Sequence, residues 1–151
     1  MRFLITLLIL FLTKFTLAET IKPNSNLLPE EVVSIQLSAL QNNNTPFKDA
    51  GIEQTWEFAH PYNRKYTGPL SNFISMMYTD SYSMILDHIE HNIILINNYE
   101  KQVFFFVEII DRQGVKLGFN WIVEQVLDEG KYKNCWMTIS VSQPIRLSHS
   151  T

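Results

Sequence analysis

Residues Phe58–Pro69 read Phe-Ala-His-Pro-Tyr-Asn-Arg-Lys-Tyr-Thr-Gly-Pro and separate two segments that have helical apolar spacing. Pro61, Gly68 and Pro69 punctuate the stretch, which predicts a fixed loop. Pro61 is expected to end the helix before the loop, and Pro69 to begin the helix after it. The residues before the loop have the pattern of an export signal and packing helices, and the residues after it are predicted to form one more helix and a sheet.

Apolar periodicity predicts three helices in the first half of the chain. The first begins at Pro29, where a proline followed by two acidic residues is typical of a first turn, and it runs to about Leu40. Asp49 is a plausible cap for the second helix, which Pro61 ends. The third helix starts near Pro69, and a turn with a short helix comes after it.

From residue 89 onward β-branched and aromatic residues dominate, and four strands are predicted. Their ranges are 89–97, 101–110, 115–127 and 132–143. The third strand alternates between apolar and polar residues, as expected when one face is buried. Because the connections are short, the strands should form an antiparallel meander. The expected fold class is α+β, with three N-terminal helices packed on a curved antiparallel sheet.

Residues 1–18 have the pattern of a signal peptide. Arg2 precedes an apolar run of about ten residues, which is too short to span a bilayer, and small residues end at Ala18. Cleavage is predicted after Ala18, which would make the protein secreted or periplasmic with no stable membrane insertion. The alternative is an uncleaved anchor, which Lys14 disfavours because charge is costly in lipid.

The length of the remaining chain corresponds to a single domain. We expect a flexible lead-in at 19–28, one α+β domain at 29–143 and a C-terminal tail at 144–151. Removing residues 1–18 leaves 10 basic against 15 acidic residues, a net charge of −5. That balance disfavours a nucleic-acid partner, which requires a basic face.

Cys135 is the only cysteine, so the chain has no internal disulfide. Its place beside Trp136 in a strand-like run favours a buried apolar cysteine. The alternative is a pair between two chains.

Several short motifs together resemble a family of uncharacterised proteins that is known only as a domain of unknown function. They are Asp49–Ile52, Phe58-Ala59, Pro61, Asn63-Arg64, Thr67–Pro69, Phe73, Met77, Phe119–Trp121 and Cys135–Thr138. The resemblance covers the chain from about Pro29 to Val141. Members of that family look like the nuclear-transport-factor-2-like (SnoaL-like) superfamily, which implies helices against a strongly bent sheet that forms a cone with a pocket. That superfamily contains isomerases, dehydratases, epoxide hydrolases and non-catalytic binding domains, so the resemblance implies no single activity and no catalytic residues.

Arg64 is a candidate ligand for an anionic group, because its planar guanidinium matches a carboxylate or phosphate. Asn63 and Thr67 lie beside it in the same stretch and could share that ligand. The alternative is structural: Arg64 would bind loop carbonyls or pair with Asp49 or Glu53.

Aromatic residues are candidates for the lining of a pocket that takes a small apolar ligand. They are Trp56, Tyr82, Trp121 and Trp136. The alternative is a core in which the same side chains leave no space.

Glu108 is the candidate for a catalytic base, because it interrupts an apolar run and burial would raise its pKa. Tyr82 or Asn63 would then assist as a polar group. The alternative for Glu108 is an outward-facing strand position.

His88 and His91 would share a face on a helix and point to opposite faces on a strand. Local composition favours the start of a strand, and no third ligand is in view. No metal site and no cofactor are therefore predicted.

These patterns leave three functional hypotheses open. The first is an exported, non-catalytic domain that binds a small apolar or anionic molecule or a protein partner, with a homodimer through the sheet as a compatible assembly. The second is an isomerase, dehydratase or hydrolase acting on a small apolar substrate in the cone pocket. The third is a structural interaction module with a filled cone.

Overall fold

The computed structural model describes residues 19–147. The predicted signal peptide at 1–18 and the last four residues of the predicted tail, 148–151, lie outside the described residues. The elements are α1 (Pro29–Gln41), α2 (Ala50–Glu57), α3 (Pro61–Thr67), α4 (Leu70–Met77), the 3₁₀ helix η1 (Ser83–Ile85), β1 (Glu90–Asn98), β2 (Gln102–Ile110), β3 (Lys116–Gln125), β4 (Trp136–Val141) and β5 (Ile145–Arg146).

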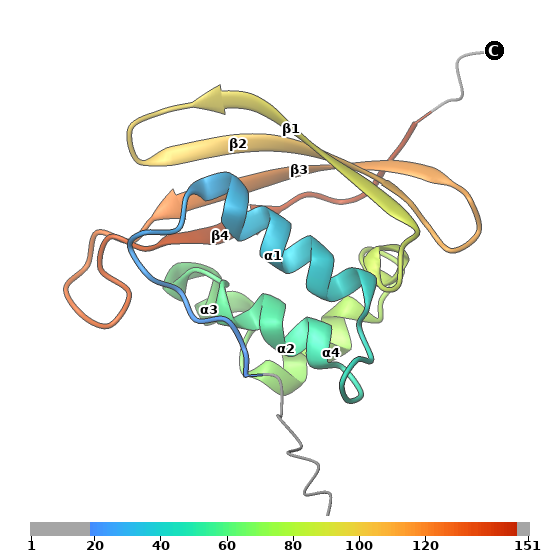
Figure 1. Ribbon diagram of the computed structural model, residues 1–151, viewed down its shortest axis with the longest axis horizontal. Helices are drawn as coiled ribbons and strands as arrows, with labels where there is room; N and C mark the ends of the chain where they lie inside the picture. Colours follow the sequence, from blue (N-terminus) through green and yellow to red (C-terminus); the bar gives the residue numbers. More distant parts are fainter. Residues whose placement is uncertain (1–18, 148–151) are drawn as a thin grey trace, which may run out of the picture.

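The strands form one antiparallel sheet in the order β1-β2-β3-β4, and the short β5 pairs with β3 beyond the end of β4. The helices lie together on one side of this sheet, with α1 nearest to it (Figure 1). The predicted α+β class is confirmed. Among the helices of residues 19–147, none combines the length and apolarity needed to cross a bilayer.

The prediction of three helices was wrong, because part of the stretch expected to be a loop folds as α3. Pro61 is the first residue of that helix and does not end the helix before it. Its fixed φ suits a first turn, where its missing N–H would have had no partner. His60 caps the turn, since its Nδ1 accepts a hydrogen bond from the amide of Tyr62 at 3.1 Å. None of the α3 side chains is buried, so apolar periodicity could not reveal it.

The fourth strand begins later than expected. β4 starts at Trp136, because the preceding residues form a loop in which Asn134 has a left-handed φ of 64°. The amide of Val126 donates to the carbonyl of Cys135 at 2.9 Å and closes this loop. Cys135 is buried, as the sequence favoured.

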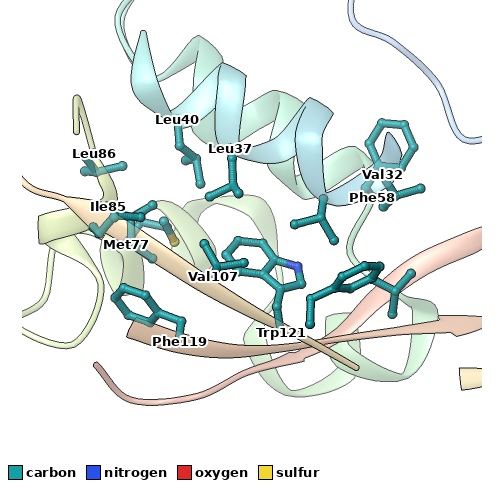
Figure 2. Packing of buried hydrophobic residues seen from close by; sticks show 14 of the residues in the cluster. Val32, Leu37, Leu40, Phe58, Met77, Ile85, Leu86, Val107, Phe119 and Trp121 are labelled. Atoms are coloured by element: carbon teal, nitrogen blue, oxygen red, sulfur yellow. The ribbon is translucent and has the colours of Figure 1, made fainter. Parts of the chain in front are cut away.

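The core lies between α1 and the inner face of the sheet. Val107, Phe119 and Trp121 rise from the strands toward Leu37 and Leu40, which point down from α1 (Figure 2). Inner positions of β2 alternate with half-exposed outer ones, so the sheet is covered fully on one face only, although the apolar sequence of this strand suggested cover on both. Each such buried side chain contributes about 1.5–3 kcal/mol to folding. A cavity bordered by this core and by several polar side chains is the candidate site.

Candidate ligand-binding site

A cavity of about 160 Å³ lies between the helices and the strands β3 and β4. Its walls are mostly apolar side chains, with a smaller set of polar ones. The apolar lining is Leu40, Ala59, Phe73, Met76, Met77, Ile85, Trp121, Ile139 and Val141; the polar lining is Gln36, Thr55, Asn63, Thr67, Tyr82, Thr138 and Ser140. An apolar wall with a few polar groups is the usual composition of a small-molecule site.

The inner end of the cavity is held by a chain of buried hydrogen bonds. The indole Nε1 of Trp121 donates to Thr138 Oγ1 at 3.0 Å, and that hydroxyl donates to Gln36 Oε1. Gln36 Nε2 in turn donates to the carbonyl of Thr55 at 3.0 Å. Because each of these side chains is held by a partner, the inner end of the cavity is rigid.

The other polar groups of the lining come from α3 and from the residue before η1. Asn63 Nδ2 donates to the carbonyl of Thr138 at 3.4 Å, and Thr67 Oγ1 donates to the carbonyl of Asn63 at 3.1 Å. Tyr82 donates its hydroxyl to the carbonyl of Val141 at 3.1 Å. Burial raises the pKa of Tyr82, so the phenol stays neutral at neutral pH. Its oxygen keeps a lone pair that can accept a hydrogen bond from a ligand.

Electrostatically the cavity is neutral. Among the described residues that line it there is no Asp, Glu, Lys, Arg or His. An ion that entered would lose its hydration without gaining an opposite charge, which is costly. The arrangement therefore suits a neutral, mainly apolar molecule.

Arg64 lies outside this lining and serves the fold. Its Nε donates to the carbonyl of Ala59 at 2.9 Å, and its Nη2 donates to those of Trp56 and Glu57 at 2.7 and 3.0 Å. The guanidinium also stands 4.8 Å from the ring centroid of Trp56 and 3.4 Å from the hydroxyl of Tyr132. It satisfies the carbonyls at the end of α2, where a positive charge is favourable. The sequence left open a structural role in which Arg64 binds backbone carbonyls or pairs with an acidic residue, and the structure has the carbonyl contacts, two of them within α2 and one just after it.

Some of the other predicted site residues line the cavity, and the rest lie elsewhere in the fold. Trp56 packs on Phe73 with ring centroids 5.1 Å apart, and Trp136 is half-buried against the core, but neither lines the cavity. Glu108 lies on the outer face of β2, 3.2 Å from Lys116 Nζ. Thus Asn63, Thr67, Tyr82 and Trp121 come together in the lining, whereas Arg64, Trp56, Trp136 and Glu108 do not.

Gln36 and Thr138 are site residues that sequence reasoning missed. A signal for Gln36 was present, since it falls on the buried stripe of α1 with Val33, Leu37 and Leu40. A polar side chain at such a position needs a partner inside the fold. Thr138 gave no comparable signal, because its partner Gln36 is distant in the sequence and meets it only in the folded structure.

The two histidines that were considered as metal ligands lie in contact. His88 precedes β1 and comes after Asp87, whose left-handed φ of 55° turns the chain, so the expectation of opposite strand faces was wrong. His88 Nε2 and His91 Nδ1 are 2.7 Å apart. Within residues 19–147 no group of three or more His, Cys, Asp or Glu side chains is placed to hold a metal ion.

The geometry of the cavity is therefore the main evidence about what this chain does. Its size, neutral lining and fixed inner end are the features from which a function can be proposed. Comparison with protein-family models, curated proteins and solved structures gives no match, so the chemistry of the site is argued from its own residues.

Proposed function

We propose that the protein is an exported, non-catalytic binding domain whose cavity takes a small, neutral, largely apolar molecule. The observation that carries this proposal is the apolar cavity of about 160 Å³ with a neutral polar side. An apolar cavity of about 150 Å³ holds a molecule the size of benzene. The ligand is accordingly an aromatic or branched aliphatic compound with one hydrogen-bonding group, which Tyr82 or Asn63 would meet.

The proposal includes the nuclear-transport-factor-2-like cone. Two features support it: the helices pack on one side of an antiparallel sheet, and the cavity lies between the two layers. Export is supported by the signal-like residues 1–18. The homodimer expected from sequence stays a prediction, and native mass spectrometry of the purified protein would report it.

The catalytic hypothesis is less well supported. An isomerase or dehydratase needs an acid or base in contact with the substrate. Glu108, the base named from sequence, pairs with Lys116 on the outer face of the sheet. Tyr82 is the one titratable side chain among the described lining residues, and the raised pKa of its phenol makes it a poor base.

Binding can be tested with benzene and with indole, two neutral probes of suitable size. Titration is followed by NMR at the methyl groups of Met76, Met77 and Ile85, which line the cavity. We expect saturable shifts at these methyl groups.

A pair of variants on one segment provides the control. Ser140 is an exposed residue of the lining, so Ser140→Phe should plug the cavity and abolish the shifts. Gln143→Phe adds the same ring at an exposed position outside the lining and should leave them unchanged. Equal binding by the wild type and Ser140→Phe, or no binding of either probe, would contradict the proposal.

A further inference from the structure

Two imidazole rings, one buried and one half-buried, share a hydrogen bond beside the cavity. His88, 2 % exposed, has its Nε2 2.7 Å from Nδ1 of His91, and its own Nδ1 lies 2.6 Å from the carbonyl oxygen of Ile85. A carbonyl oxygen can only accept, so His88 Nδ1 carries a hydrogen. When both rings are neutral, His91 Nδ1–H must therefore donate to His88 Nε2. We call His88 and His91 the histidine pair.

The histidine pair tolerates one additional proton but not two. With one, His91 is protonated on both nitrogens and still donates from Nδ1 to His88. With two, both facing nitrogens carry hydrogen, and the hydrogen bond is replaced by repulsion between two cations. The pair titrates as a coupled unit, and the contact breaks at the second step.

The surroundings favour the neutral form of the pair. Burial lowers the pKa of both rings, and the proximity of His91 lowers the pKa of His88 further. The hydrogen bond to the carbonyl of Ile85 opposes this effect and raises the pKa of His88, and Asp87 and Glu90 each raise the pKa of the ring next to them. The other packed elements bring neutral groups: α1 contributes Gln41, which binds the carbonyl of Ile89 at 2.7 Å, and β2 places Ile109 opposite His91. Protonation of the histidine pair at low pH is therefore opposed by the burial of the two rings.

The histidine pair is joined to the cavity wall through η1. Ile85, whose carbonyl accepts from His88, lines the cavity, and so does Tyr82, which immediately precedes η1. A three-residue 3₁₀ helix has few and poorly aligned internal hydrogen bonds, so it depends on external contacts. His88 supplies such a contact, because it binds the carbonyl of Ile85 through Nδ1–H and His91 of β1 through Nε2, and so ties η1 to the sheet. The bond to Ile85 survives protonation of His88, whereas the contact with His91 is the one that a second proton breaks, and its loss would untie this side of the wall from β1.

Resting on the ligand site proposed above, we propose that the histidine pair is an acid-sensitive latch. It holds η1 against the cavity while at least one ring is neutral. When both rings are charged, it releases η1 and the bound molecule.

The decisive variant is His91→Asn. The Asn amide sits where Nδ1 was and can donate to His88 Nε2, but only one titratable ring remains, so the doubly charged state cannot form. For the wild type we expect the affinity for indole to fall about tenfold between pH 7.5 and 5, because affinity scales with the fraction of closed molecules. For His91→Asn the change should stay below about twofold. His60→Asn removes a buried histidine whose ring binds the amide of Tyr62 and no residue of η1 or of the lining, and the pH response of its indole affinity should be that of the wild type.

A second measurement needs no ligand. The amides of Ile85 and Leu86 donate to the carbonyls of Tyr82 and Ser83 at 3.0 and 3.2 Å, and their hydrogen-exchange protection reports whether η1 is closed. After correction for intrinsic exchange, protection should fall at pH 5 in the wild type and not in His91→Asn.

The two measurements separate the latch from the ligand site. Acid loss of protection without indole binding at any pH supports the latch and overturns the ligand site. Indole binding with pH-independent affinity and protection overturns the latch and keeps the site. If His91→Asn does not fold, the ¹⁵N chemical shifts of the two rings in the wild type provide the test, because they report whether each ring is charged. Opening of η1 at a pH where the two rings are not both charged would overturn the latch.

Discussion

Asn43 is the residue on which the helical half of the chain most depends, because it binds three segments at once. Its Oδ1 accepts from the amide of Ile52 at 3.0 Å, and its Nδ2 donates to Asp49 Oδ1 at 3.3 Å. Its own amide donates to Asp87 Oδ1 at 3.0 Å, and its carbonyl accepts from the amide of Gly51 at 2.9 Å. The residue thus links the end of α1 to the start of α2 and to the turn before β1.

We expect Asn43→Ala to lower the free energy of unfolding by about 2–4 kcal/mol, because it leaves the amide of Ile52 buried without a partner. Urea denaturation followed by circular dichroism measures the change. Asn42→Ala, at the exposed neighbouring position, is the matched control and should change stability by less than about 1 kcal/mol. Equal effects of the two substitutions would show that the side-chain hydrogen bonds of Asn43 do not contribute to the free energy of unfolding.

Arg64 provides a second test at the level of one side chain. Its planar fork reaches three carbonyls at the end of α2, a geometry that lysine cannot reproduce. Arg64→Lys should therefore lower the free energy of unfolding by about 1–3 kcal/mol even though the charge is kept. Thermal unfolding is the measurement, and Lys65→Arg, one position along the same helix, is the control. If Arg64→Lys kept full stability but bound phosphate more weakly than the wild type, Arg64 would instead be a ligand for anions.

At the level of elements, α3 is held by a cap that is sensitive to pH. His60 Nδ1 accepts from the amide of Tyr62, so it must be unprotonated, and the hydrogen then sits on Nε2. Nε2 is buried without a hydrogen-bond partner, and Glu124 Oε1 is 3.8 Å away. Burial lowers the pKa of His60 from its ordinary 6.5, and the opposing effect of Glu124 and Asp128 is smaller.

Through His60, a fall in pH lowers the free energy of unfolding. Below pH 6.5 the unfolded chain takes up a proton at His60 that the folded chain resists, so folding loses free energy as the pH falls. The contribution of His60 is complete above pH 6.5 and is lost below it. His60→Asn keeps a capping oxygen and removes the titration. The variant should therefore lose less stability than the wild type between pH 7 and 5 in urea denaturation, and an equal loss would exclude His60 as a source of acid sensitivity.

The elements differ in how far sequence could predict them. β3 and the helix from Pro29 were predictable, because burial on one face imposes a period that can be counted. β2 was predictable from its run of β-branched and aromatic residues. α3 was not, because its seven residues bury no side chain and its start depends on the His60 cap. Within the site, Trp121 and Tyr82 were predictable from residue type. Gln36 gave a signal through its place on the buried stripe of α1, but its partner Thr138 was not predictable, since their hydrogen bond joins residues 102 positions apart.

At the scale of the whole molecule, the cavity is the place where all layers meet. Leu40 of α1, Phe73 of α4, Ile85 of η1 and Trp121 of β3 each contribute to one space. The hydrogen bonds at its inner end join α1 to β3 and β4, so the two layers are also tied to each other there. A molecule that fills the space contacts every layer at once, so its binding also stabilises the whole fold against global unfolding.

This coupling predicts the size of a thermal shift. A ligand that binds only the folded state at a concentration 100 times its Kd adds about 2.7 kcal/mol to the free energy of unfolding. For a domain of this length that corresponds to a rise in Tm of roughly 5–15 °C. Indole at saturating concentration should give such a rise in the wild type at pH 7.5, measured by calorimetry. Ser140→Phe, which fills the mouth of the cavity, should show a rise of less than about 2 °C. Because calorimetry reports on the whole fold, equal shifts in the two proteins would mean that indole binds outside the cavity.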